Sequence, residues 1–175
     1  MDIPQPSPDD APDYVGLVAG ARAWRLANTM WARMGGYLWS WSMLDCWRKG
    51  EEWKEAECRA GHRIPGEHCE CGIWAFYNVA NFEREMGAIS TARVPYTDRF
   101  QYVSGVIGAV GRIVPHEDGF RAQYAKVLAI FEDPYETPKQ QILESYTSAL
   151  AIISPDHYDA FCLEHKLIRL DWQSG

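Results

Sequence analysis

The chain has 175 residues, of which 47% are hydrophobic and eight are tryptophan, and its formal net charge is −7. This length and apolar content suit one domain with a sizeable core and argue against two independent domains. The longest apolar runs fall far short of the ~20 residues that a membrane-spanning helix needs, and the acidic excess argues against nonspecific binding to nucleic acid.

The first segment, residues 1–13, reads MDIPQPSPDDAPD and contains four prolines and four aspartates. Such a composition leaves little to bury and predicts a disordered tail, followed by a single domain over residues 14–175. The segment has no basic region followed by an apolar core. We therefore expect no secretory signal and a cytoplasmic protein.

The first predicted strands form a pair. Residues 37–44, YLWSWSML, alternate strictly, with tyrosine, tryptophan and methionine side chains on one face. A period of two with many aromatics predicts a β-strand. Because Gly35 and Gly36 just before it supply the freedom of a turn, we expect this strand to pair with an earlier one within residues 21–31.

Metal-binding side chains gather in residues 57–76, ECRAGHRIPGEHCECGIWAF. Zinc favours a tetrahedral set of thiolates and imidazoles, and clustered cysteines in a cytoplasmic protein more often bind metal than form disulfides. The predicted ligands of a structural zinc ion are Cys58, His62, Cys69 and Cys71. His68 is an alternative to His62 as the nitrogen ligand. Unliganded thiols, or a redox or disulfide pair, are the other two interpretations of the same residues.

A strand is expected over residues 71–77, CGIWAFY, directly after the cysteines. In a regular strand the Cα atoms of Cys69 and Cys71 would lie about 6.5–7 Å apart. Two sulfurs then converge on one ion only if the chain bends, which Gly72 permits. The predicted metal would fix the loop that leads into this strand and replace part of a core.

The clearest hairpin joins residues 102–114 to residues 120–132. Its tip, HEDG, contains Asp118-Gly119, a strong turn signal because glycine tolerates positive φ. Three glycines in the first strand predict bulges, sharp curvature or another backbone lying close. These are Gly105, Gly108 and Gly111.

Helices are expected between and after the strands. The first covers residues 78–87, with Asn78 as its cap and Gly87 at its end. Two C-terminal helices, at about residues 137–166, begin after Thr137 and Ser154. The last of them should bury Tyr158, Phe161, Cys162 and His165. We therefore predict an α+β fold, a curved, mostly antiparallel sheet or small barrel with short helices at its ends.

Three motifs carry a resemblance, namely ARAWRL at 21–26, C…H…P…CECGIWA at 58–75 and GAVGRIVPHEDGFRAQYA at 108–125. With them the chain resembles a family of uncharacterised small proteins of actinobacteria and actinobacteriophages, whose core reads Cys…His…Pro…Cys-x-Cys-Gly-Ile-Tyr-Ala. The match covers about residues 17–130 and departs from the family at Trp74, where tyrosine is usual, and at Gln123, where glutamate is usual. The resemblance implies shared architecture and a phage-related origin, without a chemistry.

Three functions of different kinds follow. The favoured one is a non-enzymatic, zinc-stabilised interaction protein that binds an unidentified host or cellular protein through aromatic surface and acidic helices. The second is a nucleic-acid reader, whose phosphate contacts would be Arg93, Arg99, Arg112 and Arg121. The third is an enzyme that uses the metal or the His116–Glu117 pair of the hairpin tip. Hairpin tips, however, collect polar residues for structural reasons.

Overall fold

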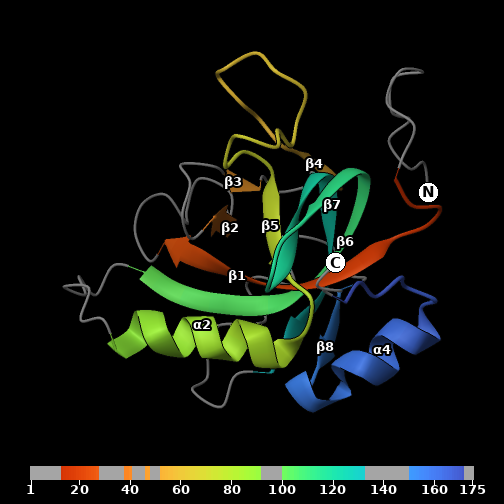
Figure 1. Cartoon of the computed structure of the whole chain (residues 1–175). Helices are drawn as coiled ribbons and strands as arrows, with labels where there is room; N and C mark the ends of the chain where they lie inside the picture. The colour runs from red at the N-terminus through yellow and green to blue at the C-terminus, as the bar shows by residue number, and fades with distance from the viewer. Residues whose placement is uncertain are drawn as a thin grey trace.

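The computed structural model describes residues 13–27, 38–40, 46–47, 52–91, 100–132 and 150–171. Within them, one mostly antiparallel sheet is flanked by two short helices, which confirms the predicted α+β class (Figure 1). The strands are β1 (Val18–Ala27), β2 (Leu38–Ser40), β3 (Cys46–Trp47), β4 (Lys54–Glu55), β5 (Ile73–Phe76), β6 (Phe100–Pro115), β7 (Gly119–Phe131) and β8 (Ala151–Ile153). The helices are α2 (Val79–Thr91) and α4 (Tyr158–Glu164), the latter preceded by the 3₁₀ turn η1 (Pro155–His157).

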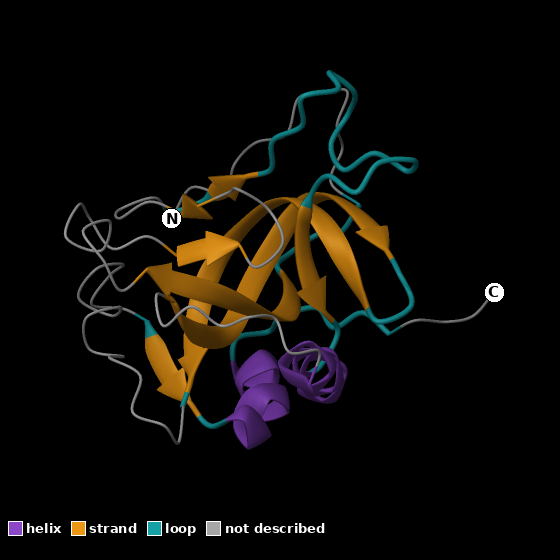
Figure 2. Cartoon of the chain, turned by 90° about the vertical axis from the view of Figure 1, so that its left-hand side faces the viewer, coloured by secondary structure: helices purple, strands orange, loops and turns teal. Residues whose placement is uncertain are grey.

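The strands curl into a partly closed ring (Figure 2). β1 pairs with β6 along its whole length, from Val18↔Ala109 to Ala27↔Phe100, and β6 pairs with β7. β7 pairs with β5, and β5 returns to β1 through Ala21↔Phe76. Because this last junction is a single residue pair, the sheet is a strongly curved ring segment and not a complete barrel.

Several strands of the sheet pair with β7. One of its edges pairs with β6. The opposite edge takes β5 at residues 119–122, β4 at residues 124–125 and, in parallel, β8 at residues 129–131. The strand β8 was not predicted from the sequence. The two strands that flank the cysteine segment, β5 and β4, therefore follow one another along one edge of β7.

Two predicted pairings are confirmed. β1 pairs antiparallel with β2, and β6 and β7 form the long hairpin. The ladder of this hairpin is interrupted between Val106 and Ile107 and between Val110 and Ile113. Its glycines also permit a close approach, since a Cβ at Gly105 would overlap the carbonyl oxygen of Ala129 in β7.

The helices are partly as predicted. Asn78 caps α2, because its Oδ1 accepts a hydrogen bond from the backbone N–H of Asn81 at 2.8 Å. The predicted end at Gly87 is wrong, since α2 continues to Thr91. A glycine inside a helix costs about 1 kcal/mol relative to alanine, which neighbouring turns can offset. In α4 the prediction that His165 is buried is also wrong, because the helix ends at Glu164 and His165 is exposed.

Some predictions lie outside the described residues, namely the turn at Gly35–Gly36, the helix over residues 137–149 and the tail up to residue 12. Asp13, the last residue of that predicted tail, is fixed against β6. Its backbone N–H donates to the carbonyl of Gly111 at 3.3 Å, and its Oδ2 accepts from the backbone N–H of Ile113 at 2.6 Å. Asp13 is therefore attached to the sheet.

Two apolar clusters lie on opposite faces of the curved sheet. One includes Trp24, Ile73 and Phe120, which are at most 2% exposed. The other lies between the sheet and the helices, where Phe82 of α2 and Phe161 of α4 are buried. Both helices cover the same face (Figure 1). Among the described residues, no helix has the length and apolar character needed to cross a membrane.

Candidate metal centre

The loop between β4 and β5, residues 56–72, is called the metal loop below. It projects from one end of the sheet (Figures 1 and 2). Within it, the predicted ligand atoms of Cys58, His62, Cys69 and Cys71 all lie within 4.8 Å of one another. His68 is exposed and does not belong to this group. The geometry therefore selects His62 as the nitrogen donor.

The distances suit one small ion. The Sγ of Cys58 lies 3.2 Å from Nε2 of His62 and 3.8 Å from the Sγ of Cys69, and the Sγ of Cys71 lies 3.9 Å from the same Nε2. Sulfurs about 2.3 Å and a nitrogen about 2.0 Å from a central zinc ion would stand about 3.5–3.8 Å apart in a tetrahedron. All three cysteines are free thiols. The four residues can hold a metal ion without a large rearrangement.

The local backbone explains how these donors converge. Cys69 and Cys71 precede β5 and lie in irregular structure, so the spacing of a regular strand does not apply to them. Gly72 then turns the chain with a φ of +117°, where a Cβ would approach the Cβ atoms of Pro65 and Arg121 at 3.0 Å. Pro65 is buried and follows a cis peptide bond. Glycine is needed at position 72 for both conformation and space.

Hydrogen bonds around the donors orient them. Nδ1 of His62 lies 2.8 Å from the carbonyl oxygen of Arg63, so that Nδ1–H donates and the lone pair of Nε2 faces the sulfurs. Metal-binding histidines usually have such a partner for their second nitrogen. The backbone N–H groups of Gly66 and Ala60 donate to the sulfurs of Cys71 and Cys58 at 3.3 and 3.5 Å. These amides stabilise thiolate charge.

The same surroundings shift the pKa values of the donors. The backbone N–H of Cys71 and then the His62 side chain lower the pKa of the Cys69 thiol to about 7. The carbonyl of Arg63 raises the pKa of His62, and burial raises the pKa of the Cys71 thiol. Because a metal ion needs thiolates and a neutral imidazole, its binding displaces protons and is favoured as the pH rises.

Arg121 of β7 anchors the metal loop to the sheet, a role that sequence reasoning missed. It is 2% exposed, and its Nη1 donates to the carbonyl oxygens of Cys69 and, at 3.0 Å, of Cys71. Its Nε donates to Nε2 of His116 at 2.7 Å, and its guanidinium lies 5.4 Å from the centre of the Trp74 ring. The register of β5 and β7, which sets Trp74 opposite Arg121, brings these groups together.

The two described members of the predicted basic patch, Arg112 and Arg121, do not form a free cationic surface. Arg93 and Arg99 lie outside the described residues. Arg121 is buried against carbonyl groups, so it is not available to a phosphate. Arg112 lies nearer the surface and pairs with Glu67, with 3.2 Å between its Nη2 and the carboxylate. The described members of the patch therefore do not favour nucleic-acid binding.

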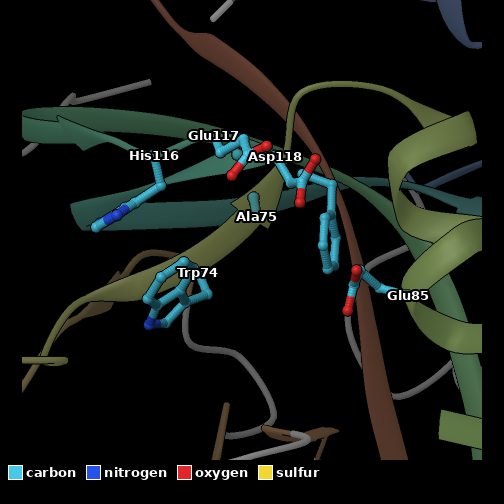
Figure 3. Close-up of a pocket in the computed structure, with 8 residues that line it drawn as sticks. Trp74, Ala75, Glu85, His116, Glu117 and Asp118 are labelled. Carbon is cyan, nitrogen blue, oxygen red and sulfur yellow. The ribbon is translucent and has the colours of Figure 1, made fainter. Parts of the chain in front are cut away.

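His116 and Glu117 are neighbours at the β6–β7 turn, but the His116 ring points away from the Glu117 carboxylate (Figure 3). Nε2 of His116 accepts from Arg121, and the ring stacks on Trp74 with 4.7 Å between centroids. Burial, and then the charge of Arg121, lower the pKa of His116. In this arrangement Nε2 of His116 is engaged by Arg121 and not by the Glu117 carboxylate.

Fold and site together define an α+β protein with a cluster of three cysteines and one histidine that can hold one metal ion. Comparisons with protein-family models, with curated proteins and with solved structures found no match to this chain. The resemblance to the actinobacterial and actinobacteriophage family therefore stays a prediction.

Proposed function

We propose that the chain is a non-enzymatic interaction protein, stabilised by a structural zinc ion, that binds a host or cellular protein in the cytoplasm. The observation that carries the metal part is the convergence of four donor atoms within 4.8 Å. Three thiolates and one imidazole are a donor set that selects zinc over magnesium or calcium, which prefer oxygen.

A structural role is supported by the number of donors. Four protein ligands complete a tetrahedron, whereas catalytic zinc sites keep one position for water or substrate. The amide hydrogen bonds to the Cys58 and Cys71 sulfurs further stabilise the donors as thiolates. A closed site of this kind supplies folding free energy and no chemistry.

The position of the metal loop explains what the ion would stabilise. The loop joins β4 to β5, which pair with adjacent parts of β7. Arg121 also holds the loop from β7 through the carbonyls of Cys69 and Cys71. An ion that fixes the loop therefore fixes two strands and the anchor at once.

An interaction role is supported by the surface. The metal loop projects from the sheet, and Trp74 next to it is 37% exposed. Aromatic side chains held at a protein surface are frequent anchors of protein interfaces. The resemblance to phage proteins favours a partner from a host cell and a phage-derived origin for the chain.

Two histidine variants test the metal part with a matched control. His62→Ala removes a donor and should lower zinc affinity by more than about a hundredfold, with a lower melting temperature. Cys71→Ser should act in the same way. His68→Ala removes an exposed imidazole of the same loop and should leave both quantities unchanged. The measurements are zinc per chain by elemental analysis, competition with a chromophoric chelator, and thermal unfolding.

Affinity capture from the native cell tests the interaction part. The three baits are the unmodified chain, its His68→Ala variant and its His62→Ala variant. We expect the unmodified chain and the His68→Ala chain to retain one protein in stoichiometric amount. The His62→Ala chain should not retain it. Purified chain without stoichiometric metal, together with equal melting temperatures for the two histidine variants, would contradict a structural zinc. Retention of nucleic acid alone would favour the reader.

A further inference from the structure

A cavity of about 410 Å³ lies where the β6–β7 turn meets β5 and α2 (Figure 3). It is called the turn cavity below. Its walls come from three elements: Trp74 and Phe76 of β5, Glu85 of α2, and His116, Glu117 and Asp118 of the turn. Cavities of this size accommodate side chains and small ligands. No role in the metal centre accounts for it.

The aromatic wall of the turn cavity is fixed before any ligand binds. The Trp74 ring stacks on His116 with an interplanar angle of 27°, and its Nε1 donates to the carbonyl of Glu70 at 3.2 Å. Arg121 lies against the same ring. An indole that is 37% exposed yet held by three neighbours binds a ligand without losing side-chain entropy.

Three carboxylates, those of Glu85, Glu117 and Asp118, also line the turn cavity. Among the described residues, neither Glu85 nor Glu117 has a hydrogen-bond or ion-pair partner. Asp118 is paired with Arg84. Since the His116 pKa is lowered, that ring adds no charge at neutral pH. Figure 3 shows Trp74 on one side of the space and the Glu85 carboxylate on the other. The turn cavity therefore combines an aromatic face with two carboxylates that pair with no described residue.

We propose that the turn cavity binds an arginine side chain of the protein partner. The inference rests on the proposed interaction function and adds the chemistry of one contact. A cation over an indole is attracted to the ring, and carboxylates at the rim accept its N–H groups. The net charge of −7 attracts a basic partner surface over longer distances.

The shape of the site favours arginine over lysine. A planar guanidinium can stack on Trp74 and at the same time direct its edge N–H groups to Glu85 or Glu117. An ammonium group is compact and has no plane to stack. The pair of Arg84 with Asp118 already places a guanidinium on a carboxylate at the rim of the same cavity.

The test is a titration of the zinc-loaded, full-length, ¹⁵N-labelled chain with N-acetyl-arginine amide. The NMR signal of the Trp74 indole N–H reports binding. The signal is assigned with Trp74→Phe. We expect a saturable shift with a dissociation constant in the millimolar range. N-acetyl-citrulline amide, similar in shape but uncharged, should bind at least about tenfold more weakly, and the lysine amide should bind more weakly than arginine.

Variants of α2 and the turn supply the control. Glu85→Gln with Glu117→Gln should weaken arginine binding at least about fivefold. Glu83→Gln changes an exposed residue of the same helix outside the turn cavity. It should change the affinity for arginine by less than about twofold. Equal shifts with arginine and citrulline would overturn the proposal. Unchanged binding after the double substitution, or equal binding of lysine, would do the same.

These outcomes are separate from those of the proposed function. If the chain holds zinc and retains its partner but does not discriminate arginine from citrulline, the proposed contact at the turn cavity is wrong. The proposed interaction function is then unaffected. If the chain binds arginine but contains no metal, the proposed arginine site stands and the proposed zinc ion is wrong.

Discussion

Arg121 shows how much a single residue of this protein depends on long-range structure. In the sequence it is one of several arginines of the central segment, and a basic patch is the simple interpretation. Its neighbours Phe120 and Ala122 are buried with it in β7, so that the strand has no solvent-facing side at this point. An arginine inside such a run signals a buried partner, but only the register with β5 shows that the partners are the carbonyls of the metal loop.

Replacing Arg121 by methionine should be costly, because the carbonyls of Cys69 and Cys71 lose a charged donor inside the protein. Hydrogen bonds to charged groups contribute about 1.5–3 kcal/mol each. We expect Arg121→Met to lower the free energy of unfolding by about 3 kcal/mol, and Arg112→Gln, which breaks an exposed pair with Glu67, by less than about 1 kcal/mol. Chemical denaturation measures both changes in the free energy of unfolding. Equal effects of the two substitutions would contradict the role of Arg121 as the anchor of the metal loop.

The cluster of candidate metal ligands could be predicted from the sequence because all four residues come from one short loop. Neighbours along the chain, such as Cys69 and Cys71, are close in space whatever the fold. The choice between His62 and His68 could not be made in this way. It depends on which imidazole the folded loop brings to the sulfurs, and that is His62, whereas His68 is exposed.

At the scale of elements, the strands that have a local sequence pattern were predictable, including the short β2 and β5, whereas β8 was not. β6 and β7 have alternation, β-branched residues and a turn signal of their own. β8 has three residues and pairs in parallel with β7, a contact between distant segments that leaves no local pattern. The end of α2 was misplaced for a related reason, because glycine weakens a helix locally but does not decide where it stops.

The close approach of β6 and β7 yields a test at this scale. A methyl group at position 105 would overlap the backbone carbonyl of Ala129, whereas one at position 108 would meet the side chain of Leu128 at 2.9 Å, which can move. We expect Gly105→Ala to cost about 3 kcal/mol and Gly108→Ala at most about 1 kcal/mol. Urea unfolding followed by tryptophan fluorescence measures the difference. Equal stability of the two variants would show that the ladder gives way at Gly105.

For the whole molecule, the metal loop and the sheet should unfold together, since β4, β5 and Arg121 connect them. Protons compete with zinc for thiolates and for His62, so acid should remove the ion. We expect the melting temperature of the zinc-loaded chain to fall by on the order of 10 °C between about pH 7.5 and about pH 5.5. Thermal scans with zinc analysis at each pH test this.

The metal-free chain is the control, and its pH dependence has the opposite sign at His62. Because the His62 pKa is raised in the fold, protonation of that residue favours the folded state. Its contribution is present below the unfolded pKa and is lost as the pH rises through the folded one. Identical pH profiles with zinc and with a chelator would mean that the ion does not contribute to stability.

The pairing of β1 has a consequence for synthesis on the ribosome. β1 pairs with residues 100–109, and Ala19 also donates to the carbonyl of Ile168 at 2.8 Å. A nascent polypeptide therefore exposes one unpaired strand edge until these distant partners have left the exit tunnel. The four candidate metal ligands emerge earlier, within residues 58–71. The proposed structural zinc would then be acquired cotranslationally, before the sheet has closed.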